Sequence, residues 1–196
     1  MLSDIYQKFK GIILNPIETF QSCHDEPLKT TIPYFIAIIS VFSCLSGIVN
    51  MFIVGVISFF YPGMNLELIV IISLLTGLFS ILYSIITAVI GLIVISLIFH
   101  VCIYILGGRK GIEKTIKATI YSFTPFALIG WIPLVNIVAW IWLFVLEVIA
   151  LREFHGVSTK RALLAVLIPV MLLIVVILLA ILAYFIIIKT GSVMVV

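Results

Sequence analysis

Long apolar runs separated by short polar breaks are the dominant pattern of the chain. Three runs exceed the roughly 20 residues that a helix needs to cross a bilayer, and two shorter runs lie between the second and the third. Turn clusters such as Tyr61-Pro62-Gly63 mark the breaks. The pattern predicts an all-α, polytopic helical bundle with five membrane segments, at residues 32–60, 68–106, 115–131, 134–151 and 162–188.

The second run is too long for one upright crossing. A helix from 68 to 106 would measure about 58 Å, against a hydrocarbon core of about 30 Å. Two crossings would fit this length, but no turn residue interrupts the run. An extra crossing would also place the basic loops that follow it on the side of the membrane opposite the basic N-terminal region. We therefore predict one long, tilted helix.

The third and fourth runs form a hairpin that is short for a full crossing. Their uncharged stretches give only about 21–23 Å of helix, and they meet at a bend around Pro133. Two interpretations stay open: Lys114 and Lys117 reach toward the headgroups and lengthen the helix, or the hairpin enters as a wedge and returns. Pro125 predicts a kink, where Thr124 or a neighbouring helix takes the unpaired carbonyl.

Composition supports a membrane protein and excludes other classes. Of the 196 residues, 64% are hydrophobic and 10% are charged, and the mean hydropathy is +1.43. Soluble domains average about 45–50% apolar and about 25% charged residues. The chain is therefore neither a water-soluble globule nor a disordered chain, and we expect a lipid bilayer rather than nucleic acid as its partner.

The distribution of charge predicts the orientation. The formal charge is +3, and if all five segments cross, ten of the eleven Lys and Arg residues fall on the N-terminal side and only Lys189 on the other. Because cytoplasmic loops carry the Lys/Arg excess, we expect a cytoplasmic N-terminus and an outer C-terminus, in the cell membrane if the source is prokaryotic. Seven loop cations are candidate lipid-headgroup contacts: Arg109, Lys110, Lys114, Lys117, Arg152, Lys160 and Arg161.

We divide the chain into a cytoplasmic or interfacial region, 1–31, and a single transmembrane domain, 32–196. Near the start, apolar residues recur at helical spacing and predict an amphipathic interfacial helix: Leu2, Ile5, Phe9, Ile12 and Ile13. Asn15 and Pro16, followed by Glu18, are a start signal for a second short helix. These helices either seal the cytoplasmic surface or dock a protein partner.

Small residues follow one face of the second segment: Ser73, Gly77, Ser80, Ser84, Ala88 and Gly91. The first segment adds others at comparable spacing: Ser40, Ser43, Cys44 and Gly47. Small side chains let helix backbones approach closely within a membrane. We interpret the two faces as an intramolecular contact, with a homo-oligomer as the alternative.

Polar groups within the apolar segments are the default candidates for function in a membrane protein, and here they are Asn50, His100 and Glu147. Because an unpaired acid in the membrane is costly, we expect Glu147 to pair with His100, with a hydroxyl or with Arg152. Such a pair is structural, or it belongs to a proton relay.

Known catalytic and metal-binding patterns are absent from the sequence. It has no Ser/His/Asp set, no His-Glu-x-x-His motif and no pair of intramembrane acids, and Cys23, Cys44 and Cys102 lack paired spacing. Cys23, His24 and His155 form at most an accidental cytoplasmic cluster. We expect no enzymatic activity, no catalytic residue, no cofactor and no metal.

Several stretches together resemble the Yip family, the membrane proteins that interact with Ypt/Rab GTPases, in its prokaryotic form. The stretches are Asn15–Phe20, the Gly107-Gly108 loop leading to Tyr121–Pro125, and Leu151–Ala162. The resemblance implies five spans, a cytoplasmic N-terminus and a non-enzymatic role. Eukaryotic relatives act in vesicle traffic and bind Rab GTPases and each other. Their long N-terminal domain and Asp-Leu-Tyr-Gly-Pro motif are absent here, so we transfer no binding residues.

Two functional hypotheses follow. The first is a membrane scaffold or adaptor that acts in membrane organisation or traffic, because the sequence has many packing features and few polar groups at membrane depth. The alternative is a small transporter or channel that uses Asn50, His100 and Glu147.

Overall fold

The computed structural model describes the backbone of residues 2–193 and the side chains of residues 3–186. In this range the chain is all-α, as predicted, and forms eight helices without a strand: α1 (Leu2–Leu14), α2 (Pro16–Ser22), α3 (Leu28–Phe59), α4 (Leu66–Ile105), α5 (Ile112–Ser122), α6 (Thr124–Ile129), α7 (Asn136–His155) and α8 (Thr159–Val193). The side chain of Lys189 lies outside the described residues.

Three of these helices, α3, α4 and α8, are long and apolar enough to cross a membrane. The prediction of one long helix over the second apolar run is confirmed, because α4 continues for 40 residues, or about 60 Å. Its start is capped by Asn65, whose side chain accepts a 2.9 Å hydrogen bond from the backbone N–H of Leu68. Pro169 lies inside α8 without ending it.

The count of five membrane segments is not supported. The predicted third segment is two short helices, α5 of 11 residues and α6 of 6 residues, which join at Phe123. Pro125 explains the break, because it has no N–H to donate to the carbonyl of Tyr121, and the hydroxyl of Thr124 donates to that carbonyl instead, at 2.7 Å. The predicted fourth segment, α7, has 20 residues and carries Glu147 and Arg152 in its second half.

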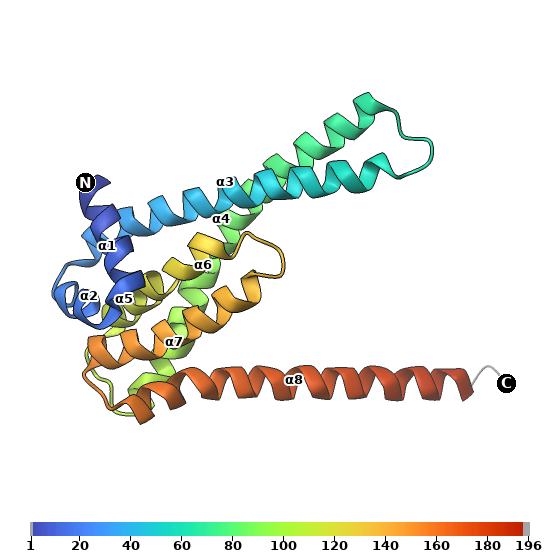
Figure 1. Cartoon of the computed structure of the whole chain (residues 1–196). Coiled ribbons are helices and arrows are strands. Elements are labelled where there is room, and N and C mark those ends of the chain that lie inside the picture. The colour runs from blue at the N-terminus through green and yellow to red at the C-terminus, as the bar shows by residue number, and fades with distance from the viewer. Residues whose placement is uncertain (1, 194–196) are drawn as a thin grey trace.

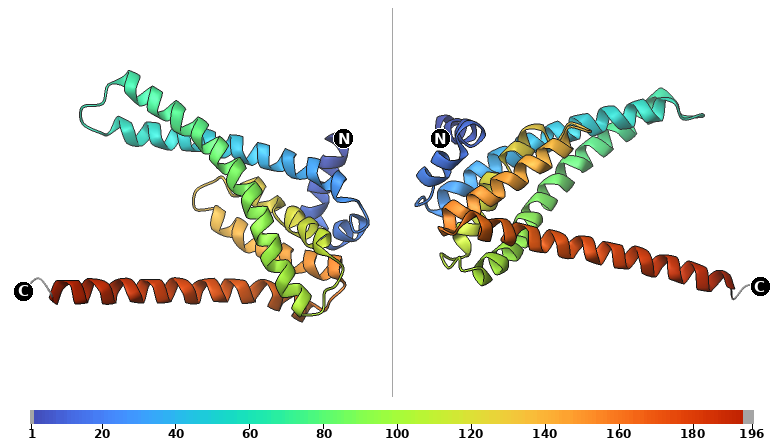
Figure 2. Two further views of the ribbon diagram at one scale, coloured as in Figure 1. Left: turned by 180° about the vertical axis from the view of Figure 1, so that it is seen from behind. Right: turned by 60° about the horizontal axis from the view of Figure 1, so that its bottom comes forward.

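The helices extend to different depths from one end of the molecule (Figure 1). This end, the N-terminal end, holds α1, α2, the α4–α5 loop and the α7–α8 connection. The α3–α4 hairpin and α8 extend far from it in diverging directions, whereas the α6–α7 turn lies part-way along (Figures 1 and 2). The hairpin of α5, α6 and α7 therefore extends less far from the N-terminal end than the α3–α4 hairpin and α8 do.

Two glycines bring α3 and α4 together. A Cβ added at Gly77 would lie 3.1 Å from the carbonyl oxygen of Gly47 and 3.0 Å from the Cβ of Met51. Here the predicted intramolecular contact between small residues is confirmed. The end of the predicted stripe takes no part in it, because a Cβ at Gly91 would meet nothing within 4 Å.

The buried core lies toward the N-terminal end. Both predicted short helices are present, and fully buried Ile12 of α1 and Phe20 of α2 belong to this core. Asn15 precedes α2 as predicted, but its side chain makes no capping hydrogen bond, and the hydroxyl of Thr19 donates to its carbonyl oxygen at 2.8 Å. The N-terminal helices are thus packed on the bundle, where α2 contacts α7.

Candidate functional site

Three segments far apart in the sequence meet at the N-terminal end through aromatic side chains. Phe20 of α2, Tyr121 of α5 and Phe154 of α7 are each fully buried. Their ring centroids lie 6.1–6.5 Å apart, and the rings of Tyr121 and Phe154 are stacked. The three stretches that carry the family resemblance therefore form one packed unit.

Helix α5 binds the loop that joins α2 to α3. The ammonium of Lys117, which is 1% exposed, donates to the carbonyl oxygens of His24 at 2.8 Å and Glu26 at 2.5 Å. It also lies 5.5 Å from the ring centroid of Phe154. Burial, followed by the neighbouring charge of Lys114, lowers the pKa of Lys117. Lys117 therefore contacts protein carbonyls rather than lipid headgroups.

Further polar contacts fix the same loop. Lys114 donates to the carbonyl oxygen of His24 and lies 3.4 Å from the carboxylate of Asp25. From α1, the buried Lys8 forms a 2.7 Å ion pair with Glu26, whose carboxylate also accepts a hydrogen bond from the hydroxyl of Tyr121 at 3.3 Å. The loop is thus held by α1 on one side and α5 on the other.

Glu147 is a buried carboxyl held by two hydroxyls. It is 1% exposed, and it accepts hydrogen bonds from Thr119, at 3.1 Å, and from Ser122 of α5. Among the described residues it has no salt bridge. Of the three partners that we considered from the sequence, the structure has the hydroxyl and neither His100 nor Arg152.

His100 instead belongs to a chain of three polar residues that joins three helices. Its Nδ1 lies 2.9 Å from the hydroxyl of Thr115, and this hydroxyl lies 2.9 Å from Nε2 of His155. His155 is 3% exposed, and its Nδ1 is buried without a hydrogen-bond partner. Burial, then the charges of His100, Lys110 and Lys114, lowers the pKa of His155 to about 4, so its imidazole is neutral at pH 7.

The structure does not bring Asn50, His100 and Glu147 together. Asn50 is exposed on α3, His100 contacts α5 from α4, and Glu147 contacts another part of α5 from α7. No group of three metal-ligating side chains occurs among the described residues. The described polar groups near α5 therefore bind helices to one another.

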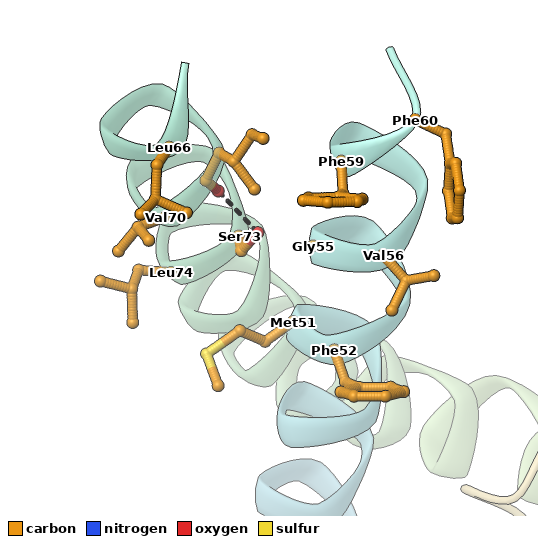
Figure 3. Close-up of a pocket in the computed structure, with 11 residues that line it drawn as sticks. Met51, Phe52, Gly55, Val56, Phe59, Phe60, Leu66, Val70, Ser73 and Leu74 are labelled. Carbon is orange, nitrogen blue, oxygen red and sulfur yellow. Dashed lines mark hydrogen bonds between the residues drawn. The ribbon is translucent and has the colours of Figure 1, made fainter. Parts of the chain in front are cut away.

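A pocket at the far tip of the α3–α4 hairpin offers no chemistry either. It has a volume of about 660 Å³ and is lined by apolar side chains that include Met51, Phe59 and Leu74 (Figure 3). Its lining hydroxyl, that of Ser73, donates to the backbone carbonyl of Ile69 at 2.7 Å. The pocket is therefore suited to an apolar surface.

The other cations that we predicted to contact lipid headgroups differ in how far they are paired with protein groups. Arg152 is half-buried and bound to Glu153 at 2.6 Å. Arg109 is exposed and lies 4.8 Å from the ring centroid of Tyr104. Lys110, Lys160 and Arg161 are exposed and form no ion pair within the described part of the chain.

Sequence reasoning missed the role of α5 as the polar centre of the bundle. The signal was present, because Thr115, Thr119 and Ser122 recur at spacings of four and three in a predicted membrane segment. The sequence interpretation also treated His155 as part of an accidental cluster, whereas the structure places it beside Thr115 in the core.

Comparison with known proteins agrees with the resemblance found in the sequence. No curated protein and no solved structure matches the chain. A family model described as the Yip1 domain matches residues 10–182, which include the three converging stretches and all the helices from α2 to α7. The chain therefore belongs to the Yip1 domain family.

Proposed function

We propose that this protein is a non-enzymatic membrane scaffold that expands the cytoplasmic leaflet and so curves the bilayer toward the cytoplasm. The observation that carries the proposal is the unequal reach of the helices. Within the described residues, α1, α2, α5 and one end each of α3, α4, α7 and α8 lie at the N-terminal end, but only the α3–α4 hairpin and α8 extend to the far side (Figure 1). The protein therefore occupies more area in one leaflet than in the other.

The surface of the short hairpin supports its insertion in lipid. Large apolar side chains at its turn and along the outer face of α7 are exposed: Leu134, Ile137, Trp140 and Ile141. Contiguous apolar surface of this kind is costly in water and stable against acyl chains. The hairpin thus acts as a wedge that adds volume at one end.

The charges support a cytoplasmic N-terminal end. Lys110 of the α4–α5 loop and Arg161 at the start of α8 lie at the same end as α1 and α2. The Lys/Arg excess of short loops marks the cytoplasmic side, which also makes the far end of α8 the outer end. In this orientation the scaffold presents α1 and α2 to cytoplasmic partners.

The proposal is tested by reconstitution into liposomes, with the diameter measured by cryo-electron microscopy and the orientation by protease access to the N-terminal helices. The native chain is expected to reduce the diameter and to form tubules as the protein-to-lipid ratio rises. A double variant, Ile137→Asn with Ile141→Asn, makes the outer face of α7 polar and should abolish this effect.

The matched control is Leu172→Asn with Leu179→Asn on α8, because these two side chains are as exposed as those of Ile137 and Ile141. Because α8 spans by its great apolar length, this variant should still narrow the liposomes. If the native chain leaves the diameter unchanged in the cytoplasm-out orientation, the scaffold proposal is wrong.

A further inference from the structure

The α4–α5 loop and the segment from Gly156 to Arg161 each place a cation against a glycine of the other. A Cβ added at Gly107 would lie 3.1 Å from Nη1 of Arg161, and one added at Gly156 would lie 3.1 Å from Nζ of Lys110. Each cation thus lies over a glycine of the opposite loop. Both glycines have positive φ, +101° and +66°, so larger residues there would be strained as well as crowded.

Lys110 and Arg161 have no carboxylate partner among the described residues. The other buried or half-buried cations at this end are occupied: Lys8 by Glu26, Lys117 by backbone carbonyls and Arg152 by Glu153. Neither Lys110 nor Arg161 forms a salt bridge or a hydrogen bond with a carboxylate among the described residues, and both are exposed. Lys160, next to Arg161, is exposed and unpaired in the same way. This corner therefore complements an anion.

An exposed apolar face of α8 begins three residues after Arg161. Arg161 lies three and seven residues before Leu164 and Ile168, and hence on the same face of the helix. These two residues line a shallow apolar hollow of about 390 Å³, here called the α8 groove, whose other lining residues also belong to α8: Leu167, Met171, Leu172 and Val175. The neighbouring face of α8, with Ala162, Ala165 and Val166, is buried against the bundle, so the groove faces the lipid.

We propose that this corner is a binding site for one anionic phospholipid. Lys110 and Arg161 hold its phosphate, and one acyl chain lies in the α8 groove that begins at Leu164. A guanidinium and an ammonium provide a planar fork and a point charge, a combination that suits phosphate oxygens. The unpaired cations argue for an anion, and the apolar groove on the same face of α8 as Arg161 argues for a lipid rather than a free anion.

The test is native mass spectrometry of the full chain released from nanodiscs that contain equal amounts of dioleoylphosphatidylglycerol and dioleoylphosphatidylcholine. The native chain should retain one phosphatidylglycerol molecule in preference to phosphatidylcholine. A double variant, Lys110→Gln with Arg161→Gln, removes two cations near the membrane surface, and its preference should fall about thirtyfold.

The matched control is Lys10→Gln with Lys29→Gln. Both lysines are exposed, unpaired among the described residues and away from the groove, so this variant loses equal charge but should keep the preference. A second variant, Lys110→Arg with Arg161→Lys, restores both charges and guards against misfolding, and it should retain the lipid.

Three results would overturn the proposal. The first is a native chain without preference for phosphatidylglycerol. The second is an equal loss in the control variant, which would show general attraction to a negative surface. The third is displacement of the lipid by the same concentration of glycerophosphoglycerol, a headgroup without acyl chains, since this would mean that the groove contributes nothing and the site takes a free anion.

Discussion

Gly47 of α3 and Gly77 of α4 lie against each other, and a Cβ added to either would come within 3.0–3.1 Å of the carbonyl oxygen of the other. Backbones can approach this closely only when both contact residues lack side chains. The contact joins the two helices whose shared hairpin reaches the far side of the molecule (Figure 1). A short loop and this pair of glycines hold the hairpin together.

We expect Gly77→Leu to separate α3 from α4 and to lower stability by about 1–3 kcal/mol, the usual cost of overpacking. Thermal unfolding in detergent measures the loss. Gly91→Leu is the control on the same helix, because a Cβ there meets nothing within 4 Å, and it should unfold at or above the native temperature. Equal losses for the two variants would show that helix geometry, not the contact, is responsible.

Removal of the Lys117 ammonium should loosen the loop between α2 and α3. Lys117→Met keeps the long aliphatic stem but leaves the carbonyl oxygen of Glu26 without its donor, whereas that of His24 still accepts from Lys114. The expected cost is about 1–3 kcal/mol per unsatisfied buried group. Hydrogen exchange of the loop amides should rise in this variant and not in Lys29→Met, which changes an exposed lysine at the start of α3. Unchanged exchange would rule out this role.

The long apolar runs were enough to predict α3, α4 and α8, because a helix that fills a bilayer must carry an uninterrupted apolar surface. The same reasoning counted α5, α6 and α7 as spans. An uncharged stretch is apolar enough to enter lipid, but its run length does not reveal where Pro125 divides it or how far the hairpin reaches.

The contacts of α5 could not be predicted for a different reason. Its lysines bind carbonyls of His24 and Glu26, about 90 residues earlier in the chain, and every residue has a carbonyl. Only the folded path of that loop selects these two. Glu147 was easier, because a buried acid needs a donor, and a hydroxyl was among the few groups within reach.

Glu147 is expected to be dispensable for stability. Its two donors, Thr119 and Ser122, also lie 3.2 Å and 3.1 Å from the backbone carbonyls of Thr115 and Thr119, so they keep acceptors when the carboxyl is removed. Glu147→Leu should therefore unfold within about 1 kcal/mol of the native chain or at a higher temperature, since replacing a buried polar group by an apolar one is often neutral or stabilising. A loss of several kcal/mol would show that the carboxyl itself orders the α5–α7 contact.

Acid should destabilise the protein through His155. In the folded state the pKa of this imidazole is about 4, whereas its ordinary value, which applies to the unfolded chain, is 6.5. Burial and the charges of His100, Lys110 and Lys114 oppose its protonation in the folded state. As pH falls below 6.5 the unfolded chain takes up a proton that the folded chain refuses, so stability falls until about pH 4, by up to about 3 kcal/mol. His155→Gln cannot gain this proton and should flatten that part of the pH profile. His24→Gln, which changes a less buried histidine at the same end, should retain the native slope, and if His155→Gln retains it too, another group is responsible for the acid sensitivity.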